Sequence, residues 1–282
     1  MRAMAAPASL SVAIVTHAPD MRLLARTLAS LADAAAHAFE GELLAAAHLI
    51  VVDNGPEGNA RDLELLARAA LDRAPCMTFE VISGQGNVGF ARANNLALAR
   101  AGAELHLVLN PDVEMDRESL AAALRHLAEN ADVGAITPAV RDATGRRQYL
   151  VKAYPGAGVL FVRAFVPRFL HALFRKSLYA YELRERDWSR EQSPVELASG
   201  CFLLCRRAPL DAVGGFDPGF FLYFEDFDLT LRLAATTKIA YCPQVRIVHH
   251  GGDAASKGLR HVAWFVRSGV RFFSKHGWNR PH

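Results

Sequence analysis

The chain has 282 residues, of which 51% are hydrophobic and 22% charged, and its formal net charge at pH 7 is +3. These values are typical of one large globular domain, or of a domain with an appended lobe, and they exclude a disordered chain. A net charge this small gives no argument for nucleic acid, so no nucleic-acid partner is predicted.

The four cysteines form neither a C-x-x-C pair nor a Cys/His set with the spacing of a zinc site. Scattered cysteines of this kind indicate reduced thiols in a reducing compartment. The first ten residues lack the apolar core of a signal peptide, and no segment reaches the ~18 apolar residues that span a bilayer. A cytoplasmic location is therefore predicted.

Residues 10–140 alternate between short apolar segments and amphipathic ones. The apolar segments are rich in β-branched residues and predict strands, whereas the segments between them have apolar residues at helical spacing. Asp20 is the expected cap of the first helix. The strands are expected at residues 11–16, 48–53, 78–83 and 105–110, and the later helices at residues 62–72, 90–100 and 116–130.

This alternation predicts an α/β fold with a mostly parallel, Rossmann-like sheet between layers of helices. Ligands of such sheets bind beyond the carboxyl ends of the strands. Asp53, Asn87 and residues 110–112 follow those ends. They are therefore the first candidates for a binding site.

The segment NPDVEM, residues 110–115, contains a candidate metal site. Asn110 and Asp112 are two positions apart, so in an extended backbone both side chains leave the same side. Their oxygens suit Mg²⁺ or Mn²⁺, whose coordination phosphates and water usually complete. The same segment is also typical of an Asx turn after a strand, and both interpretations remain open.

Two further motifs also follow apolar segments. In HHGG, residues 249–252, a neutral imidazole can bind a metal ion, although a solvated surface turn is the alternative. In GQGNVGFARANN, residues 84–95, a glycine-rich turn before a helix resembles a phosphate loop. Its glycines and asparagines can equally serve close packing and helix capping.

Residues 141–193 form an insertion of amphipathic, basic character that proline and glycine interrupt. A second αβ unit follows in residues 194–258, with a strand at 198–207 and a short helix at 208–216. The last segment, residues 259–282, begins with an amphipathic helix, expected at about residues 259–276. We expect its apolar stripe to contain Val262, Phe265, Val266, Val270 and Phe273, and its basic stripe Arg267, Arg271 and Lys275.

The segment FFLYFEDFDLTLR, residues 220–232, crowds three carboxylates among aromatic residues. If Asp226 begins a helix, the positive helix end favours its anion, whereas apolar neighbours raise its pKa. A carboxylate under these opposing effects can accept a proton near neutral pH, as a general base does. An acid-rich helix start without a catalytic role is the alternative, but it leaves the aromatic residues unexplained.

Taken in order, these motifs resemble those of family 2 glycosyltransferases, in the rhamnosyltransferase-like subgroup. The resemblance covers residues 11–252 and rests on VAIVTHAPD, IVVDNGPEGN, GNVGFARANNLAL, LVLNPDVEM, ASGCFLLCRR, VGGFDPGFFLYFEDFDLTLR and VRIVHHGG. It implies a single GT-A domain with a nucleotide-sugar-binding half (10–140) and an acceptor and catalytic half (194–258). It also implies a nucleotide-sugar donor, a divalent cation (Mg²⁺ or Mn²⁺) and inversion at the anomeric carbon.

The resemblance also assigns the donor and metal residues. Thr16, Asp53 and Asn87 lie in segments that bind the donor nucleotide, although VDNGPEGN lacks the usual Ser-Thr-Asp ending. Asn110 and Asp112 stand at the D-x-D metal motif, where the asparagine is a neutral ligand. His249 is the implied histidine of the metal site, and His250 is the alternative ligand.

The remaining assignments concern the acceptor side. Asp226 matches the catalytic base. Glu225 and Asp228 are expected either to orient it or to hold helix and arginine partners such as Arg232. Gly200 and Asp217 lie in segments that shape the donor and acceptor pockets.

The implied reaction is inverting sugar transfer, with L-rhamnose from dTDP-L-rhamnose as the best match. The acceptor is a hydroxyl of a glycan or a polyprenyl-diphosphate-linked glycan, in the synthesis of bacterial surface polysaccharide such as O-antigen, lipopolysaccharide or cell wall. The enzyme is expected on the inner face of the plasma membrane. The basic insertion and the C-terminal helix either contact an anionic membrane or form a solvated lobe over the acceptor cleft.

Three other classes of protein share parts of this pattern. A non-catalytic nucleotide-sugar-binding protein would account for Asn110. A nucleotidyltransferase shares the sheet but requires a glycine-rich, basic signature after the first strand, where this chain has THAPDMR. A dinucleotide oxidoreductase requires its glycine fingerprint at the same place.

Overall fold

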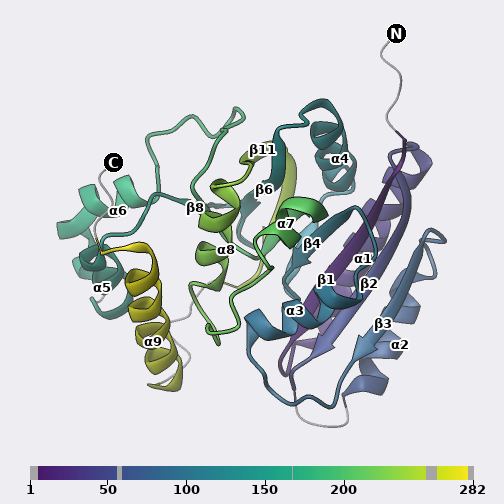
Figure 1. Ribbon diagram of the computed structural model, residues 1–282, viewed down its shortest axis with the longest axis horizontal. Coiled ribbons are helices and arrows are strands. Elements are labelled where there is room, and N and C mark those ends of the chain that lie inside the picture. Colours follow the sequence, from purple (N-terminus) through teal and green to yellow (C-terminus); the bar gives the residue numbers. More distant parts are fainter. Residues whose placement is uncertain (1–5, 56–58, 167, 252–258, 279–282) are drawn as a thin grey trace.

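The computed structural model describes residues 6–55, 59–166, 168–251 and 259–278. Helices cover both faces of a central sheet, and a smaller group of helices lies to one side of it (Figure 1). Residues 56–58 of the turn after the second strand and Gly252 of the HHGG motif lie outside the described residues. None of the described helices has the length and hydropathy that crossing a membrane requires.

The first part of the chain confirms the predicted alternation. Asp20 caps the first helix, because its side chain accepts hydrogen bonds from the backbone N–H groups of Arg22 and Leu23. The strands of this part pair in parallel in the order β3-β2-β1-β4. The elements are β1 (Ala8–Thr16), α1 (Met21–Glu40), β2 (Leu44–Asp53), α2 (Ala60–Leu71), β3 (Met77–Ile82), α3 (Phe90–Arg100) and β4 (Leu105–Leu109).

The second part extends the same sheet but makes it mixed. Strand β10 lies antiparallel between β4 and β6, whereas β11 is parallel to β6, and β5 is antiparallel to β11. Within the described residues the sheet has nine strands, because β7 pairs with β6 beside the main order. The elements are β5 (Val113–Met115), α4 (Ser119–Glu129), β6 (Val133–Arg141), β7 (Arg147–Gln148), β10 (Phe202–Arg206), α7 (Arg207–Ala212), α8 (Glu225–Ala234) and β11 (Lys238–His249).

The predicted single strand over residues 198–207 is two strands. Strand β9 (Leu197–Ala198) pairs with β8 (Val151–Lys152) in a separate two-stranded sheet, and only β10 joins the central sheet. The chain bends between them because the amide of Gly200 donates to Asp226 Oδ2 at 3.0 Å instead of to a neighbouring strand. The bend therefore brings this glycine to the candidate base.

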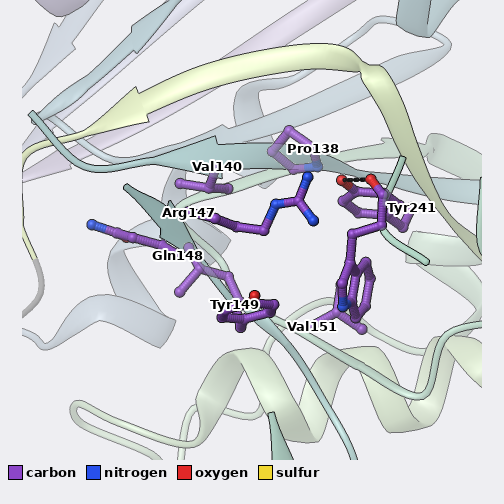
Figure 2. A pocket seen from close by; sticks show the side chains of 9 residues that line it. Pro138, Val140, Arg147, Gln148, Tyr149, Val151 and Tyr241 are labelled. Atoms are coloured by element: carbon purple, nitrogen blue, oxygen red, sulfur yellow. Dashed lines mark hydrogen bonds between the residues drawn. The ribbon is translucent and has the colours of Figure 1, made fainter. Parts of the chain in front are cut away.

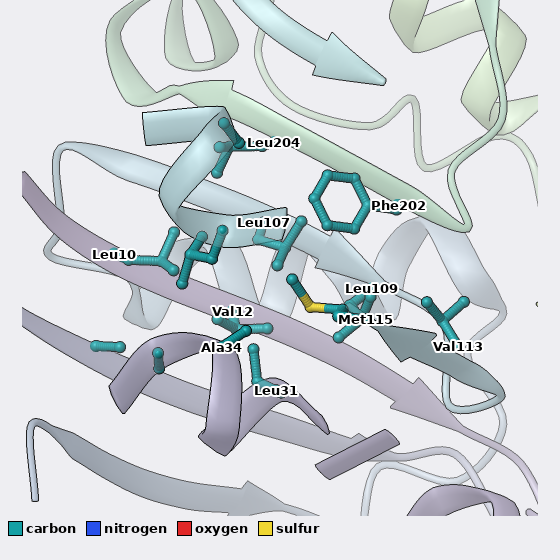
Figure 3. Close-up of a cluster of buried hydrophobic side chains, with 14 of the residues drawn as sticks. Leu10, Val12, Leu31, Ala34, Leu107, Leu109, Val113, Met115, Phe202 and Leu204 are labelled. Atoms are coloured by element: carbon teal, nitrogen blue, oxygen red, sulfur yellow. The ribbon is translucent and has the colours of Figure 1, made fainter. Parts of the chain in front are cut away.

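Apolar side chains from both parts of the sheet form one core beneath α1. Leu10 and Val12 of β1, Leu107 of β4 and Phe202 of β10 meet Leu31 of α1, and all of them are buried (Figure 3). The continuous apolar strands thus bury side chains on both faces, as a sheet covered by helices requires.

The insertion and the chain end form the smaller group of helices, α5 (Ala157–Phe165), the 3₁₀ helix η1 (Arg168–Phe174), α6 (Arg175–Tyr181) and α9 (Leu259–His276). The bounds of α9 are as predicted, but the predicted apolar stripe is partly wrong. Val266 and Val270 are exposed, whereas Ser268, Gly269 and Phe272 are buried. The small residues face inward because they allow α9 to approach the ring of Phe224, 3.5 Å from a Cβ placed on Gly269.

Candidate active site

The carboxyl ends of β1 and β2 bring Thr16 and Asp53 together, as expected of neighbouring parallel strands. The two residues are partners in the strand register, and Thr16 Oγ1 donates to Asp53 Oδ1 at 3.4 Å. The backbone N–H of Gly55 donates to the same oxygen at 2.8 Å. Asp53 is therefore a buried carboxylate held by two donors, with its backbone at the rim of the sheet.

The glycine-rich loop places Asn87 next to this pair. Asn87 Nδ2 lies 3.5 Å from Nδ1 of His17, the residue that follows Thr16. Asn87 Oδ1 accepts a hydrogen bond from the amide of Gly89 at 3.1 Å. Gly89 has a φ of 85°, and a Cβ there would lie 2.6 Å from the carbonyl oxygen of Phe221. The loop requires glycine at this position because it touches the segment that leads to Asp226.

Sequence inspection missed three polar residues of this region, His17, Asn54 and Gln85. Gln85 Nε2 donates to the backbone oxygen of Asp53 at 2.7 Å, and Asn54 Nδ2 donates to the oxygen of Gly89 at 3.2 Å. Gln85 Oε1 is buried and has no hydrogen-bond partner among the described residues, so it is an acceptor that a ligand with a donor group can use. In the sequence, the only sign that Gln85 belongs to the site is its position between Gly84 and Gly86 in the glycine-rich loop.

Asp112 lies at the end of β4, but the backbone there is a turn at residues 111–112, not the extended segment that the spacing argument assumed. Thr27 Oγ1 donates to the oxygen of Pro111 at 2.9 Å, and the amide of His250 donates to the oxygen of Asp112 at 3.0 Å. These bonds tie the turn to α1 and to the end of β11. These bonds, and not the geometry of an extended strand, therefore determine the orientation of Asp112.

The structure separates the two histidines. His249 Nε2 lies 3.6 Å from Asp112 Oδ1, whereas His250 Nε2 contacts Glu114, which also pairs with Arg26. His249 Nδ1 lies 3.0 Å from Gln148 Oε1, which can only accept, so Nδ1 carries the proton and Nε2 keeps a lone pair when the ring is neutral. Gln148 was not singled out in the sequence, because nothing in its local motif indicates a role.

These residues fit a divalent cation. Asp112 Oδ1 is buried, has no hydrogen-bond partner among the described residues, and lies 3.6 Å from the Nε2 of His249. The described residues contain no group of three or more His, Cys, Asp and Glu side chains suited to a metal ion. One carboxylate and one imidazole match an ion that takes its other ligands from phosphates and water.

Asp226 lies in the first turn of α8 and is partly buried. Its Oδ2 accepts from Gly200 and its Oδ1 accepts from the amide of Phe227 at 2.8 Å. Burial raises the pKa of Asp226, and the hydrogen bonds from Gly200 and Phe227 oppose that effect. The balance is the one that a carboxylate base requires.

Glu225 is a buried neighbour with a different charge state. Burial, and then the charge of Asp226, raise the pKa of Glu225 well above its usual value. Glu225 Oε2 has no hydrogen-bond partner in the described structure. Of the two carboxyl groups, Glu225 is therefore the one that keeps its proton to higher pH, and Asp226 is the one that ionises first.

The aromatic residues hold a strained backbone in front of Asp226. Tyr223 and Phe224 have φ values of 71° and 64°, which cost residues other than glycine roughly 1–3 kcal/mol each. Packing of the Phe224 ring compensates for this strain. Its centroid lies 5.1 Å from the ring centroid of Phe265 and 5.4 Å from that of Phe272, both on α9. The aromatic density thus fixes the start of α8 and the direction of Asp226.

The two other acids of this region anchor α9. Asp217 accepts from Arg271 at 2.9 Å and from Lys275 at 2.8 Å, although it was expected to shape a pocket. Asp228 accepts from Arg232 at 2.8 Å, which confirms that expected pair, and also from Lys275 and His276. Burial opposes ionisation of both acids, but these donors outweigh it and hold each pKa below the usual range.

The candidate base and the candidate metal residues lie on the same side of the sheet. The amide of Asn110 donates to the oxygen of Cys201 at 2.9 Å, one residue after the Gly200 that binds Asp226. Burial raises the pKa of the Cys201 thiol to about 12, and the charges of both Asp112 and Asp226 contribute. Cys201 is therefore within electrostatic reach of both carboxylates.

A small pocket lies beside Gln148, between β6, β7 and β11 (Figure 2). Arg147 extends along it between Pro138 and Tyr241, and Tyr149 forms another wall. The Tyr241 hydroxyl donates to the backbone oxygen of Trp188 at 3.0 Å, which joins the pocket to the basic insertion. The pocket thus lies between residues of the insertion, among them the His249 partner Gln148, and strands β6 and β11 of the central sheet.

Residues 11–214 match Glycosyl transferase family 2. The chain is 28% identical over 271 residues to an N-acetylglucosaminyl-diphospho-decaprenol L-rhamnosyltransferase of Mycobacterium tuberculosis, a match that covers 89% of this chain and 81% of that protein. It is 27% identical over 206 residues to rhamnosyltransferase WbbL of Escherichia coli, with 70% and 74% covered.

Solved structures show the same fold at low identity. GalNAc-T7 with UDP, GalNAc and Mn²⁺ aligns with a TM-score of 0.63 at 14% identity and covers 95% of this chain. The mannosyltransferase PcManGT of Pyrobaculum calidifontis, with GDP-Man and Mn²⁺, aligns with a TM-score of 0.63 at 19% identity and covers 98%. The chain spans 48% of the first and 66% of the second structure.

These alignments confirm an α/β fold with a mostly parallel, mixed sheet, as in GT-A glycosyltransferases. The family match ends before Asp226 and His249, so the roles of these two residues rest on the geometry described above. It nevertheless covers well over half of the chain, and the protein is accordingly a member of Glycosyl transferase family 2.

Proposed function

We propose that this protein is an inverting, metal-dependent hexosyltransferase that moves L-rhamnose from dTDP-L-rhamnose to a lipid-linked glycan during the synthesis of bacterial surface polysaccharide. The names of its relatives support the sugar and the acceptor, since both are rhamnosyltransferases and one acts on a diphospho-decaprenol glycan. The single observation that carries the proposal is that two consecutive residues bind both candidate groups: the amide of Gly200 donates to Asp226 Oδ2 at 3.0 Å, and the oxygen of Cys201 accepts from the amide of Asn110 at 2.9 Å, next to Asp112.

The donor is held at the carboxyl ends of the first strands. Thr16, Asp53 and Asn87 bind its nucleotide, and Gln85 Oε1, which has no partner among the described residues, accepts a hydrogen bond from it. Asp112, His249 and the amide oxygen of Asn110 would hold Mg²⁺ or Mn²⁺. When bound, the cation offsets the negative charge that develops on the leaving nucleoside diphosphate.

The chemistry at Asp226 is a single displacement. A carboxylate oxygen of Asp226 accepts the proton of the acceptor hydroxyl, whose oxygen forms a bond to the anomeric carbon. The bond from that carbon to the diphosphate oxygen breaks on the opposite face, so the configuration inverts. Glu225 remains protonated and leaves Asp226 as the base, because burial and the neighbouring charge disfavour its anion.

A panel of nucleotide sugars tests the proposal. Each donor is incubated with a short-chain N-acetylglucosaminyl-diphospho-lipid and Mn²⁺ or Mg²⁺, and both nucleoside diphosphate and the extended glycan are measured. We expect the highest transfer with dTDP-L-rhamnose and loss of transfer in EDTA. Binding of a donor by calorimetry without any transfer would instead identify a non-catalytic nucleotide-sugar-binding protein.

A further inference from the structure

Three cations of the basic insertion converge on one carboxylate. Lys152 Nζ and Arg163 Nη1 lie 3.5 Å and 3.4 Å from Glu182 Oε1, and Arg184 Nη2 lies 2.6 Å from Glu182 Oε2. They come from three places in the chain: Lys152 from β8, Arg163 from α5, and Arg184 from the segment after α6. We call these three residues the cation cluster.

The cation cluster carries more positive charge than its described partner neutralises. All three of its described ion pairs share Glu182, and residues 154–181 contain no Asp or Glu. Burial lowers the pKa of Lys152 to about 7, and the nearby charge of Arg163 contributes, against the opposite effect of Glu182. A further anion beside these groups would relieve this repulsion.

The cation cluster is open to solvent on one side. The side chains of Arg163 and Arg184 are 41% and 38% exposed, whereas that of Lys152 is buried at the base of the cluster. The Arg184 guanidinium lies 4.9 Å from the ring centroid of Tyr149 and 4.6 Å from that of Tyr179, so two rings hold its orientation. Arg184 Nε and Nη2 both bind Glu182 Oε2, so a phosphate would take the remaining N–H donors of a guanidinium that is already held in place.

The cation cluster also lies near the candidate base. Lys152 pairs with Leu197 of β9, and β9 leads directly to Gly200, which donates to Asp226. Tyr181 interacts with both: Lys152 Nζ is 5.3 Å from its ring centroid, and burial and then the charge of Asp226 raise the pKa of Tyr181 against the effect of Arg163. A ligand whose anionic group binds the cluster can therefore present a neighbouring group to Asp226.

An exposed apolar surface adjoins the cation cluster. Phe169 and Leu173 of η1 are 79% and 78% exposed, and Phe161 of α5 is 60% exposed. Helices α5, η1 and α6 are in mutual contact, and Tyr179 of α6 connects the apolar residues to Arg184. Large apolar side chains exposed together are typical of a binding surface.

We propose that the insertion binds the phosphate groups and the first part of the hydrocarbon chain of a lipid-linked diphosphate acceptor. Lys152, Arg163 and Arg184 take the phosphates, and the surface formed by Phe161, Phe169 and Leu173 takes the chain. The pairing of excess positive charge with exposed apolar residues selects this amphiphile over a free phosphate. The assignment of this ligand as the acceptor rests on the proposed function, whereas its binding does not.

Farnesyl diphosphate is a soluble probe of this site. Calorimetry in EDTA measures its binding without a contribution from a cation at Asp112 and His249, beside farnesol and inorganic pyrophosphate as partial probes. We expect farnesyl diphosphate to bind more tightly than either. Arg163→Gln and Arg184→Gln should each raise its Kd about tenfold, the loss expected for one charge-assisted hydrogen bond.

Matched variants separate the two halves of the site. Arg190→Gln removes the same charge from an 84% exposed side chain outside the cation cluster, and should change the Kd less than about twofold. Leu173→Ser should weaken farnesyl diphosphate about tenfold and leave pyrophosphate unchanged, because it removes only apolar contact. Circular dichroism of each variant confirms that it is folded.

Three results would overturn the inference: no binding of farnesyl diphosphate by the wild type, equal loss in Arg190→Gln, or an unchanged Kd in both cluster variants. If the cluster variants lose binding only to phosphatidylglycerol vesicles, the insertion is a general membrane contact and the inference is also wrong. Failure of the proposed function looks different: no donor supports transfer, while farnesyl diphosphate still binds with the expected dependence on Arg163 and Arg184.

Discussion

Asp226→Asn is the substitution that tests the proposed base most directly, because it keeps the size of the side chain. The amide oxygen of asparagine can still accept from Gly200, now 3.0 Å from Oδ2. In the wild type, Oδ1 accepts from the amide of Phe227 at 2.8 Å. In the variant, the amide nitrogen of asparagine takes the place of Oδ1, so two N–H donors face each other. The variant therefore loses the charge and one hydrogen bond.

The expected loss of activity is large and the loss of stability small. A positioned general base contributes about 10²–10⁴-fold, so kcat should fall about a thousandfold, or ~4 kcal/mol of activation free energy. One lost hydrogen bond at a buried site lowers the free energy of unfolding by about 1–3 kcal/mol, which leaves the protein folded. Donor affinity should stay unchanged, because Thr16, Asp53 and Asp112 are untouched.

Glu225→Gln is the informative comparison. Since Glu225 is protonated next to the charge of Asp226, a neutral amide resembles its native state. The variant should lose less than about tenfold in kcat, far less than Asp226→Asn. Equal losses in the two variants would mean that the proton is shared between both carboxyl groups.

The assay follows nucleoside diphosphate release at saturating donor and acceptor, with donor affinity measured separately by calorimetry. Asp211→Asn, which removes an exposed carboxylate paired with Arg207 on α7, is the control for a lost surface charge. If Asp226→Asn retained kcat within tenfold of the wild type, Asp226 would not be the base. A parallel loss of donor affinity would indicate a binding role instead.

Four further outcomes follow from the structure. The kcat/KM of the wild type should fall as pH drops through the raised pKa of Asp226, because the base acts only when deprotonated; a pH profile without this acidic limb contradicts the assignment. Asp112→Asn should raise the Mn²⁺ concentration for half-maximal activity at least about tenfold, measured by metal titration, since it removes the charged ligand. Gly269→Leu should lower the free energy of unfolding by about 1–3 kcal/mol in urea, because its side chain meets the ring of Phe224, whereas Gly269→Ala should be tolerated. Above pH 7 the free energy of unfolding of the wild type should rise by about 1 kcal/mol per pH unit, because lysine in the unfolded chain keeps its proton up to its usual pKa of 10.5, whereas Lys152, with a pKa of about 7, does not. Lys152→Met should remove this rise, and parallel curves for variant and wild type would refute the reasoning.

Local patterns in the sequence were sufficient for most of the elements. Helices α3 and α9 have the predicted bounds, and Asp20 caps α1 as expected. These features depend on residues within one or two turns of each other, which is the range that periodicity and capping describe. The order of the polar motifs likewise indicated the family, which the match over residues 11–214 confirmed.

Long-range contacts explain each departure from prediction. The segment that contains Gly200 leaves its strand to bind Asp226, 26 residues later, and α9 turns Gly269 inward to fit Phe224. The choice between His249 and His250 depends on Gln148 and Glu114, both about a hundred or more residues away. No local pattern carries this information.

The sequence by itself determined the kinds of element, their order and the polar residues at the strand ends, because burial periodicity and helix capping act between near neighbours in the chain. Only the tertiary structure decided which of these residues meet: the protonated Glu225 beside Asp226, the lone pair of His249 beside Asp112, and three cations around Glu182. The physical reason is that charge state and ligand geometry depend on desolvation and on partners from distant segments, which folding alone brings together.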